Sequence, residues 1–173
     1  MPQGWAQRIV FTAAALVLAA LAALAGLLVA RSAGARGYPV SQLKEGVNAA
    51  NLQITPMFVV RDGSFAFAIR PFTPGGGTDP VAWCPKQGFF EAWSTGAKFG
   101  VDGAYIAGPA SRGLDRYAST IVNGVLTVDP TKVDPGPPRG PAAPATKLPS
   151  CDWSTALFPP GVVPEGSPTP QPG

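Results

Sequence analysis

The pattern of apolar and polar positions begins with a long uncharged apolar run from Ile9 to Ala30. A helix of 22 residues is about 33 Å long, enough to cross a hydrocarbon core of about 30 Å. The alternative is a signal peptide, because Ala33, Gly34 and Ala35 resemble a small-residue cleavage site. The apolar region of a signal peptide usually has only about 7–15 residues. We therefore expect a retained membrane anchor.

The middle of the chain has the pattern of short β-strands. Residues 57–60 form a compact apolar run, and residues 64–70 alternate so that Phe65, Phe67 and Ile69 share one face. Favoured hairpin turns stand at 62–63 (Asp-Gly), 102–103 (Asp-Gly) and 123–124 (Asn-Gly). Further strands are expected at 97–101, 105–107, 117–122 and 125–128. With no long helix after the anchor, this spacing predicts a small antiparallel, all-β barrel or sandwich.

The last part of the chain is rich in proline. From Asp129 onward it holds 13 of the 21 prolines. Proline has a fixed φ and no amide donor, so we expect an extended tail without helices or inner strands. Residues 151–158 interrupt this tail with Trp153, Leu157 and Phe158, and such apolar side chains favour docking on a folded domain.

These patterns divide the chain into five segments. We expect a short leader at 1–8, a transmembrane helix at 9–30, a hinge at 31–37, a β domain at 38–130 and a proline-rich tail at 131–173. Lysine and arginine counts on the two sides of the anchor do not decide its orientation. Because the leader is too short to form a domain, we expect it to stay in the cytoplasm while the β domain is exported.

Composition narrows the possible chemistry. The net charge is only +3 and the basic residues are scattered, so no nucleic-acid interface is predicted. The absence of histidine excludes His-based metal sites, Ser-His-Asp triads and Cys-His dyads. Two cysteines alone cannot form a four-Cys site. In an exported domain Cys84 and Cys151 are expected to form a disulfide; the alternative is a free structural thiol at Cys84.

The order of segments resembles a membrane-anchored Rieske-type iron–sulfur protein over about residues 38–130. Residues 57–69, MFVVRDGSFAFAI, resemble the opening hairpin of that family. Residues 98–129 resemble the part that follows its second ligand loop. The features that carry this second likeness are Phe99, Asp102, Gly103, Gly108, Pro109, Ala110, Arg112, Leu114, Asn123 and Gly124.

The ligand positions of the family are largely replaced. The family uses Cys-x-His with a trailing Leu-Gly-Cys, and Cys-x-x-His-Gly-Ser, so that two thiolates hold one iron and two imidazoles the other. Cys84 is retained, while Lys86 and Phe89 stand where the first His and second Cys belong. Ala92 and Thr95 replace the Cys and His of the second box. The resemblance thus implies a Rieske fold that has lost its cluster and binds no cofactor.

Several residues near these loops have two interpretations. Five aromatic side chains either fill the space that a cluster would occupy or form an exposed patch that docks onto a partner. They are Trp83, Phe89, Phe90, Trp93 and Trp153. Gly108, Pro109 and Ala110 occupy the family's cluster-covering loop and are expected here to form a rigid turn. Lys86 is expected to be a solvated loop lysine. Glu91 stands alone in the sequence, without a partner for acid–base catalysis.

The resemblance and the anchor together imply a function. We expect a non-catalytic, single-pass cell-membrane protein whose β domain lies on the extracytoplasmic side. It would be an accessory or structural subunit of a quinol-oxidising respiratory or photosynthetic electron-transfer complex, with the integral subunits of that complex as partners. One alternative is an electron carrier that still binds a [2Fe–2S] cluster with outside ligands. Another is a cell-envelope binding module that uses the proline-rich tail.

Overall fold

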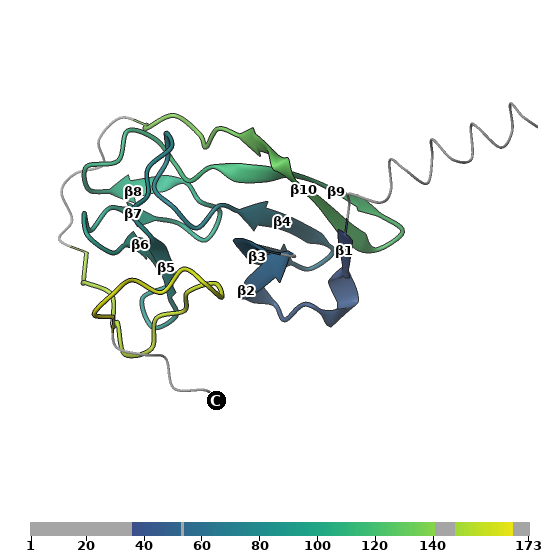
Figure 1. The fold of residues 1–173 in the computed structure, drawn as a ribbon, viewed down its shortest axis with the longest axis horizontal. Helices are drawn as coiled ribbons and strands as arrows, with labels where there is room; N and C mark the ends of the chain where they lie inside the picture. The colour runs from purple at the N-terminus through teal and green to yellow at the C-terminus, as the bar shows by residue number, and fades with distance from the viewer. Residues whose placement is uncertain (1–35, 53, 141–147, 168–173) are drawn as a thin grey trace, which may run out of the picture. The chain divides into compact units, whose positions relative to one another are not determined.

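A computed structural model describes residues 36–52, 54–140 and 148–167. Figure 1 shows how the described strands are arranged. They are β1 (Arg36–Pro39), β2 (Gly46–Leu52), β3 (Thr55–Asp62), β4 (Phe65–Ile69), β5 (Val81–Cys84), β6 (Phe89–Ala92), β7 (Lys98–Phe99), β8 (Tyr105–Ala107), β9 (Arg116–Val122) and β10 (Val125–Asp134), with a short 3₁₀ helix η1 (Val40–Gln42) after β1.

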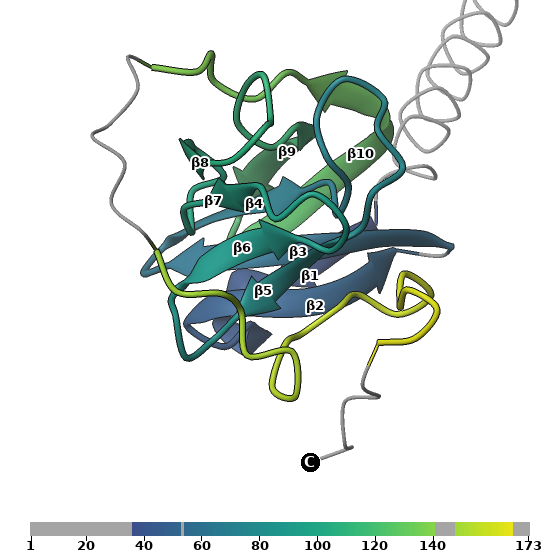
Figure 2. The same cartoon turned by 90° about the vertical axis from the view of Figure 1, so that its left-hand side faces the viewer.

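The strands form two sheets. The larger sheet has six strands in the order β1-β10-β9-β4-β3-β2, and the smaller has four in the order β5-β6-β7-β8. The chain leaves the larger sheet after β4, builds the smaller sheet and returns to the larger one with β9 and β10 (Figure 2). Neighbouring strands pair antiparallel in β2 with β3, β3 with β4, β4 with β9, β9 with β10, β5 with β6, β6 with β7 and β7 with β8. The prediction of an all-β antiparallel fold is confirmed.

The predicted hairpins form, but two of their turns are shifted from the predicted positions. Asn123 and Gly124 connect β9 to β10 with φ of 51° and 74°, the left-handed conformation that a type I′ turn requires. In the first hairpin Asp62 pairs with Phe65, so the turn lies at Gly63 and Ser64 rather than at 62–63. In the hairpin that joins β7 to β8 the amide of Gly103 donates to the carbonyl of Gly100 at 2.8 Å, so the turn lies at 101–102 rather than at 102–103. The strand predicted at 97–101 is limited to Lys98–Phe99.

The central strand β3 is buried on both sides, which explains its uninterrupted apolar run. Phe58 and Val60 contribute to the core shared with Phe90 and Phe99 of the smaller sheet. The alternate residues of β3 belong to a second cluster on the other side, where they pack with residues of β9 and β10. Successive side chains of a strand point to opposite faces, so a strand covered on both faces has no polar positions to alternate with.

Strand β2 was not predicted. Its sequence, GVNAANL, is poor in the β-branched and aromatic residues that are enriched in strands. It pairs along its whole length with β3, from Gly46 opposite Arg61 to Leu52 opposite Thr55. The strand therefore forms because β3 offers an edge to pair with, and its own composition contributes little.

The prediction that no inner strand forms after Asp129 is wrong. Strand β10 lies between β1 and β9 and continues to Asp134, which pairs with Arg116. Pro130 is accommodated because the register shifts between Asp129 and Val133. A proline is tolerated at such an irregularity, where the ladder of hydrogen bonds is already interrupted.

The predicted anchor at 9–30 lies outside the described residues, and so does most of the predicted hinge. Within residues 36–52, 54–140 and 148–167, no helix has both the length and the apolar character needed to cross a bilayer.

Candidate functional site

The segment that resembles the first ligand box of the Rieske family is a closed hairpin turn between β5 and β6. Cys84 ends β5 and pairs with Phe89, which begins β6. The amides of Gln87 and Gly88 both donate to the carbonyl of Cys84, at 3.1 and 2.8 Å. Gly88 has a φ of 74°, which glycine adopts without strain. The turn therefore keeps its shape through its own backbone hydrogen bonds.

A disulfide joins this turn to the tail. Cys84 and Cys151 are bonded across 67 positions of sequence, with their Cα atoms 5.5 Å apart, and both residues are buried. This is the pairing that the sequence predicted. The thiolate is the form of cysteine that ligates a metal, and the bonded sulfur of Cys84 is no longer such a ligand.

The tail segment around Cys151 docks as predicted. The amide of Trp83 donates to the carbonyl of Leu157 at 2.9 Å, and the amide of Leu157 donates back at 2.8 Å. Ala156 and Phe158, on either side of Leu157, are buried. The tail thus pairs with β5, which is the edge strand of the smaller sheet, and it runs beside that strand (Figure 2). Covering an edge in this way also protects its backbone groups from unwanted pairing.

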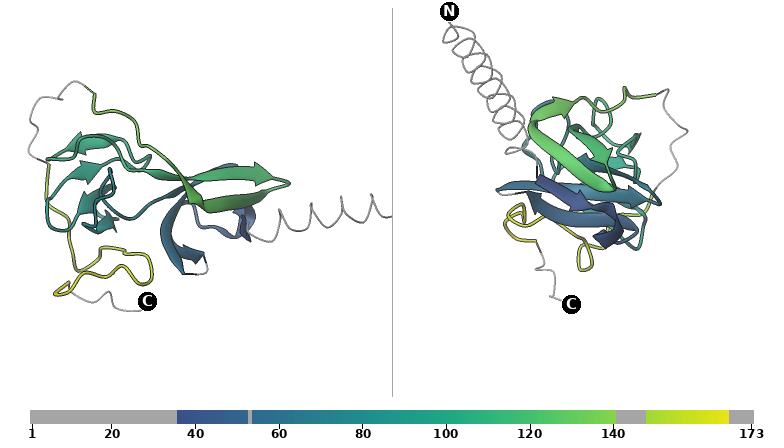
Figure 3. Two further views of the ribbon diagram at one scale, coloured as in Figure 1. Left: turned by 45° about the horizontal axis from the view of Figure 1, so that its top comes forward. Right: turned by 90° about the vertical axis from the view of Figure 1, so that its right-hand side faces the viewer.

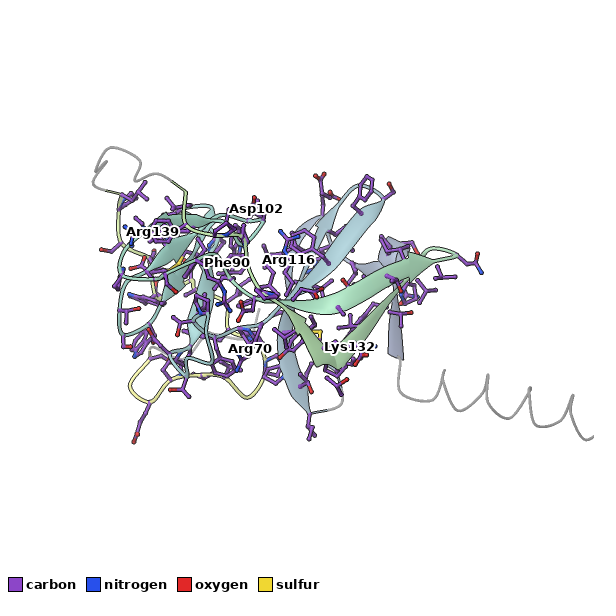
Figure 4. The ribbon with its side chains drawn as sticks, turned by 90° about the horizontal axis from the view of Figure 1, so that it is seen from above. Arg70, Phe90, Asp102, Arg116, Lys132 and Arg139 are labelled. Atoms are coloured by element: carbon purple, nitrogen blue, oxygen red, sulfur yellow. A yellow bond between two sulfur atoms is a disulfide. The ribbon has the colours of Figure 1, made fainter. Side chains whose placement is uncertain are left out.

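The aromatic residues of the loop separate onto two faces of β6. Phe90 is fully buried between the sheets (Figure 4), with its ring centroid 4.9 Å from those of both Phe58 and Trp83. Phe89, the preceding residue, is buried in a different cluster that includes Cys84 and Cys151. Consecutive residues of a strand face opposite ways, so a single apolar dipeptide stabilises both the inter-sheet core and the docked tail.

Trp93 continues the cluster on the tail side. Its ring lies edge-on to Trp153 at 4.7 Å, and Phe158 stacks on Trp153 at 6.3 Å. Trp93 and Trp153 are half-buried and pack against the cluster that holds the disulfide. Aromatic pairs in edge-to-face geometry stabilise by about 0.5–1.5 kcal/mol beyond their buried area. These side chains therefore act together to hold the tail on the sheet.

A buried ion pair crosses from β6 to β7. Glu91 and Lys98 are cross-strand neighbours, only 5% and 8% exposed, and Oε2 of Glu91 lies 2.7 Å from Nζ of Lys98. The same carboxylate oxygen accepts the amide of Cys151 at 2.8 Å, and the ammonium lies 5.1 Å from the ring centroid of Phe89.

The expectation that Glu91 stands alone is therefore wrong. Its partner lies seven residues away in the sequence, and only the pairing of β6 with β7 makes the two neighbours. A buried charge in an otherwise apolar setting is stable only when it is paired and hydrogen-bonded. The pair therefore ties the tail to both strands.

Lys86 lies on the surface, at the position of the family's first histidine ligand. Its Nζ is 2.6 Å from Oδ2 of Asp152. The hydrogen bond from Lys86, followed by one from Ser154, lowers the pKa of Asp152 to about 2. The interpretation as a solvated loop lysine agrees with this exposure, and the ion pair adds a second link between the hairpin turn and the tail.

The second ligand box is also a tight turn. The hydroxyl of Thr95 donates to Asp79 at 2.8 Å, and the amides of Ser94 and Thr95 donate to the same carboxylate at 2.9 and 3.2 Å. The amide of Gly96 donates to the carbonyl of Ala92, which is fully buried. Asp79 thus binds this turn from the loop before β5, a contact that sequence reasoning did not find.

The Gly-Pro-Ala loop packs against the second box. Gly108 has a φ of 96°, and a Cβ on it would lie 2.6 Å from the Cα of Ala97. The hydroxyl of Tyr105 donates to the carbonyl of Gly108 at 2.7 Å. A pocket of about 270 Å³ lies here, lined by Thr73, Pro74, Thr95, Ala97, Pro109, Ala110 and Ser111. The lining holds hydroxyl groups but neither a charged side chain nor a thiol.

Asp115 connects three loops beside this pocket. It is buried, and its Oδ1 accepts from Nε and a terminal nitrogen of Arg112 at 3.1 and 2.7 Å. The same oxygen accepts the amide of Gly136 at 3.0 Å, and Oδ2 accepts that of Gly75 at 3.4 Å. Asp115 was not predicted, because its partners are brought together only by the fold.

The residues present do not fit a Rieske cluster. Cys84 is bonded to Cys151, while Phe89 and Ala92 carry no donor atom. Lys86 is paired with Asp152 and Thr95 with Asp79. Across the part of the chain that the structure describes, no group of three or more Cys, Asp or Glu residues could hold a metal ion.

Comparison with known proteins finds similarity at the level of solved structures. The plasma membrane Rieske protein PetC3 from Synechocystis PCC 6803 is 28% identical with a TM-score of 0.39, covering 48% of this chain and 85% of that one. The ferredoxin of carbazole 1,9a-dioxygenase from Nocardioides aromaticivorans IC177 is 23% identical with a TM-score of 0.39, covering 55% and 95%. No family model and no curated protein matches.

Proposed function

We propose that this chain is a cluster-free, Rieske-like structural subunit of a membrane electron-transfer complex of the quinol-oxidising kind. In this proposal residues 9–30 anchor it, and the β domain lies outside the cytoplasmic membrane. The observation that carries the proposal is the Cys84–Cys151 disulfide. The bond uses the sulfur of Cys84, the one ligand position of the family that keeps its residue. It links the β5–β6 turn to the tail by a covalent bond that persists in oxidising, extracytoplasmic compartments.

The contacts around the disulfide support a structural role. Where the family's loops are held by a cluster, the turns here are held by the tail, by the Glu91–Lys98 pair and by Asp79. The pocket beside Thr95 is lined without charged groups, so its lining offers no set of metal ligands. Such contacts suit a subunit that holds other chains in position.

The test is purification from native membranes in a mild detergent, followed by identification of the co-purifying chains and metals. We expect integral redox subunits to co-purify with the full chain. A tail deletion after Asp134 is the informative control, because it removes Cys151 and the docked segment while leaving the anchor. Recovery of the chain in a complex without any redox subunit would overturn the proposal.

Iron analysis of the chain after its separation from that preparation distinguishes the proposal from an electron carrier that holds a cluster with its own residues. The isolated chain, free of its partners, is expected to contain no iron and to give no electron paramagnetic resonance signal after reduction. A [2Fe–2S] signal that stays with the isolated chain would contradict the cluster-free assignment, because it would require ligands that Cys84, Lys86 and Thr95 do not supply.

A further inference from the structure

Large apolar side chains are exposed at one end of the larger sheet. Phe65 is 74% exposed, Val122 is 59% exposed and Ile121 is 37% exposed. We call these three residues the apolar tip. Phe65 follows the β3–β4 turn, while Ile121 and Val122 precede the β9–β10 turn, and Figure 3 shows the β9–β10 hairpin projecting at this end of the domain.

The two turns lie at the same end of the domain. Strands β4 and β9 pair antiparallel, so the beginning of β4 and the end of β9 point the same way. A hollow between the turns is lined by Gly63 and Ser64 on one side and by Asn123 and Gly124 on the other. The apolar tip is therefore contributed by two neighbouring hairpins, with Ile121 and Val122 on opposite faces of β9.

The chain enters the domain beside this tip. Gly37 of β1 lies next to Leu126 of β10, and three residues later the amide of Val40 donates to the carbonyl of Gly124 at 2.8 Å. Six residue steps separate Ala30, where the predicted anchor ends, from Arg36, where β1 begins. Such a segment spans at most about 21 Å when fully extended, so an anchored domain keeps this end within reach of the bilayer surface.

Charges next to the tip neutralise one another. Nε of Arg61 lies 3.4 Å from Oε2 of Glu45 and donates to the carbonyl of Gly63 at 3.0 Å. Oε1 of Glu45 accepts the amide of Gly63 at 2.7 Å. The β3–β4 turn is thus held by an internal ion pair, and Lys44 and Asp62 add one further charge of each sign. A neutral surface with an aromatic and two β-branched side chains suits the polar–apolar boundary of a bilayer.

We propose that the apolar tip inserts into the lipid interface next to the anchor and so fixes the orientation of the β domain on the membrane. The occupant of this surface is bilayer lipid, and zwitterionic lipid is the probe because the charges of the β3–β4 turn, Arg61 and Glu45, pair with one another. The inference rests on the anchor at 9–30 that is part of the proposed function.

The test is photo-crosslinking of the full chain reconstituted in phosphatidylcholine vesicles. The amino acid p-benzoylphenylalanine replaces Phe65 in one variant, Ile54 in a second and Leu21 in a third. Ile54 is the matched control, because it is 91% exposed but lies at the β2–β3 turn, at the opposite end of β3. Leu21 reports on the anchor itself.

Lipid adducts at 65 and 21, with none at 54, are the result that we expect. Adducts at 21 without adducts at 65 would overturn the insertion of the tip and leave the anchor intact. Adducts at neither 21 nor 65 would overturn both, whereas adducts at 65 alone would overturn the anchor and keep the tip. In native membranes, crosslinks from 65 to a protein in place of lipid would assign the tip to a protein partner and overturn the proposal.

Discussion

Replacing Lys98 with methionine tests whether the buried ion pair holds the two loops together. Methionine keeps the length of the side chain and removes the ammonium that lies 2.7 Å from Glu91. The carboxylate would then be buried with only the amide of Cys151 as a hydrogen-bond donor. Removing one partner of a buried pair costs about 3–5 kcal/mol, so the Lys98→Met variant should lose that much of its free energy of unfolding.

The double variant Glu91→Gln/Lys98→Met separates the stability effect of losing the ion pair from the cost of leaving one buried charge without a partner. With both charges gone, no buried charge lacks a partner, and glutamine still accepts a hydrogen bond from Cys151. A buried pair replaced by neutral groups of similar volume is often close to neutral in stability, so the double variant should be more stable than Lys98→Met alone. The difference from additivity is the coupling free energy of the two residues.

The measurement is urea-induced unfolding of the oxidised full chain, followed by tryptophan fluorescence. Trp93 and Trp153 lie in the cluster that loosens when the tail is released, so they report on the affected region. Lys86→Met is the matched control, because its Nζ lies at a similar distance, 2.6 Å, from Asp152 but is exposed. Exposed pairs contribute little. If Lys98→Met destabilises the protein no more than Lys86→Met does, the reasoning from burial fails.

Three further predictions concern the same loops. The double variant Cys84→Ser/Cys151→Ser should lose about 4 kcal/mol in the same unfolding experiment, the chain-entropy contribution of the loop that the disulfide closes; an unchanged midpoint would contradict it. Lys86→Gln should raise the pKa of Asp152 from about 2 toward its ordinary 3.8, as measured by carboxyl NMR titration. Because the folded pKa is the lower one, the stabilisation by this carboxylate is complete above the unfolded value and disappears as pH falls through about 2. Gly108→Ala should cost about 1–3 kcal/mol, because a side chain there is strained at positive φ and its Cβ meets a backbone Cα at 2.6 Å; normal stability would refute that contact.

The predictable parts of the fold depend on local preferences. The Asn123–Gly124 turn could be found because these two residues adopt left-handed conformations at little cost. The apolar run from 57 to 60 could be identified as buried because no polar residue interrupts it. The docking of the tail could be expected because burial of the apolar side chains within this proline-rich segment is energetically favourable.

The candidate site depends much more on long-range pairing. Glu91 meets Lys98 only because β6 pairs with β7, and it meets Cys151 only because the tail returns to β5. Asp115 collects donors from three loops whose positions no local pattern encodes. An isolated charged residue has the same appearance in a sequence whether it faces solvent or a buried partner.

Residue identities alone indicate roughly where the chain turns, which segments are apolar, that histidine is absent and that Cys84 has one possible partner within the chain. Each of these properties follows from residue identity and near neighbours. Only the tertiary structure decided that β2 forms, that β10 continues past Pro130 and that the tail covers the edge of β5. Those outcomes depend on which distant strand offers hydrogen bonds and on which buried charges find partners, and both are set when the sheets assemble.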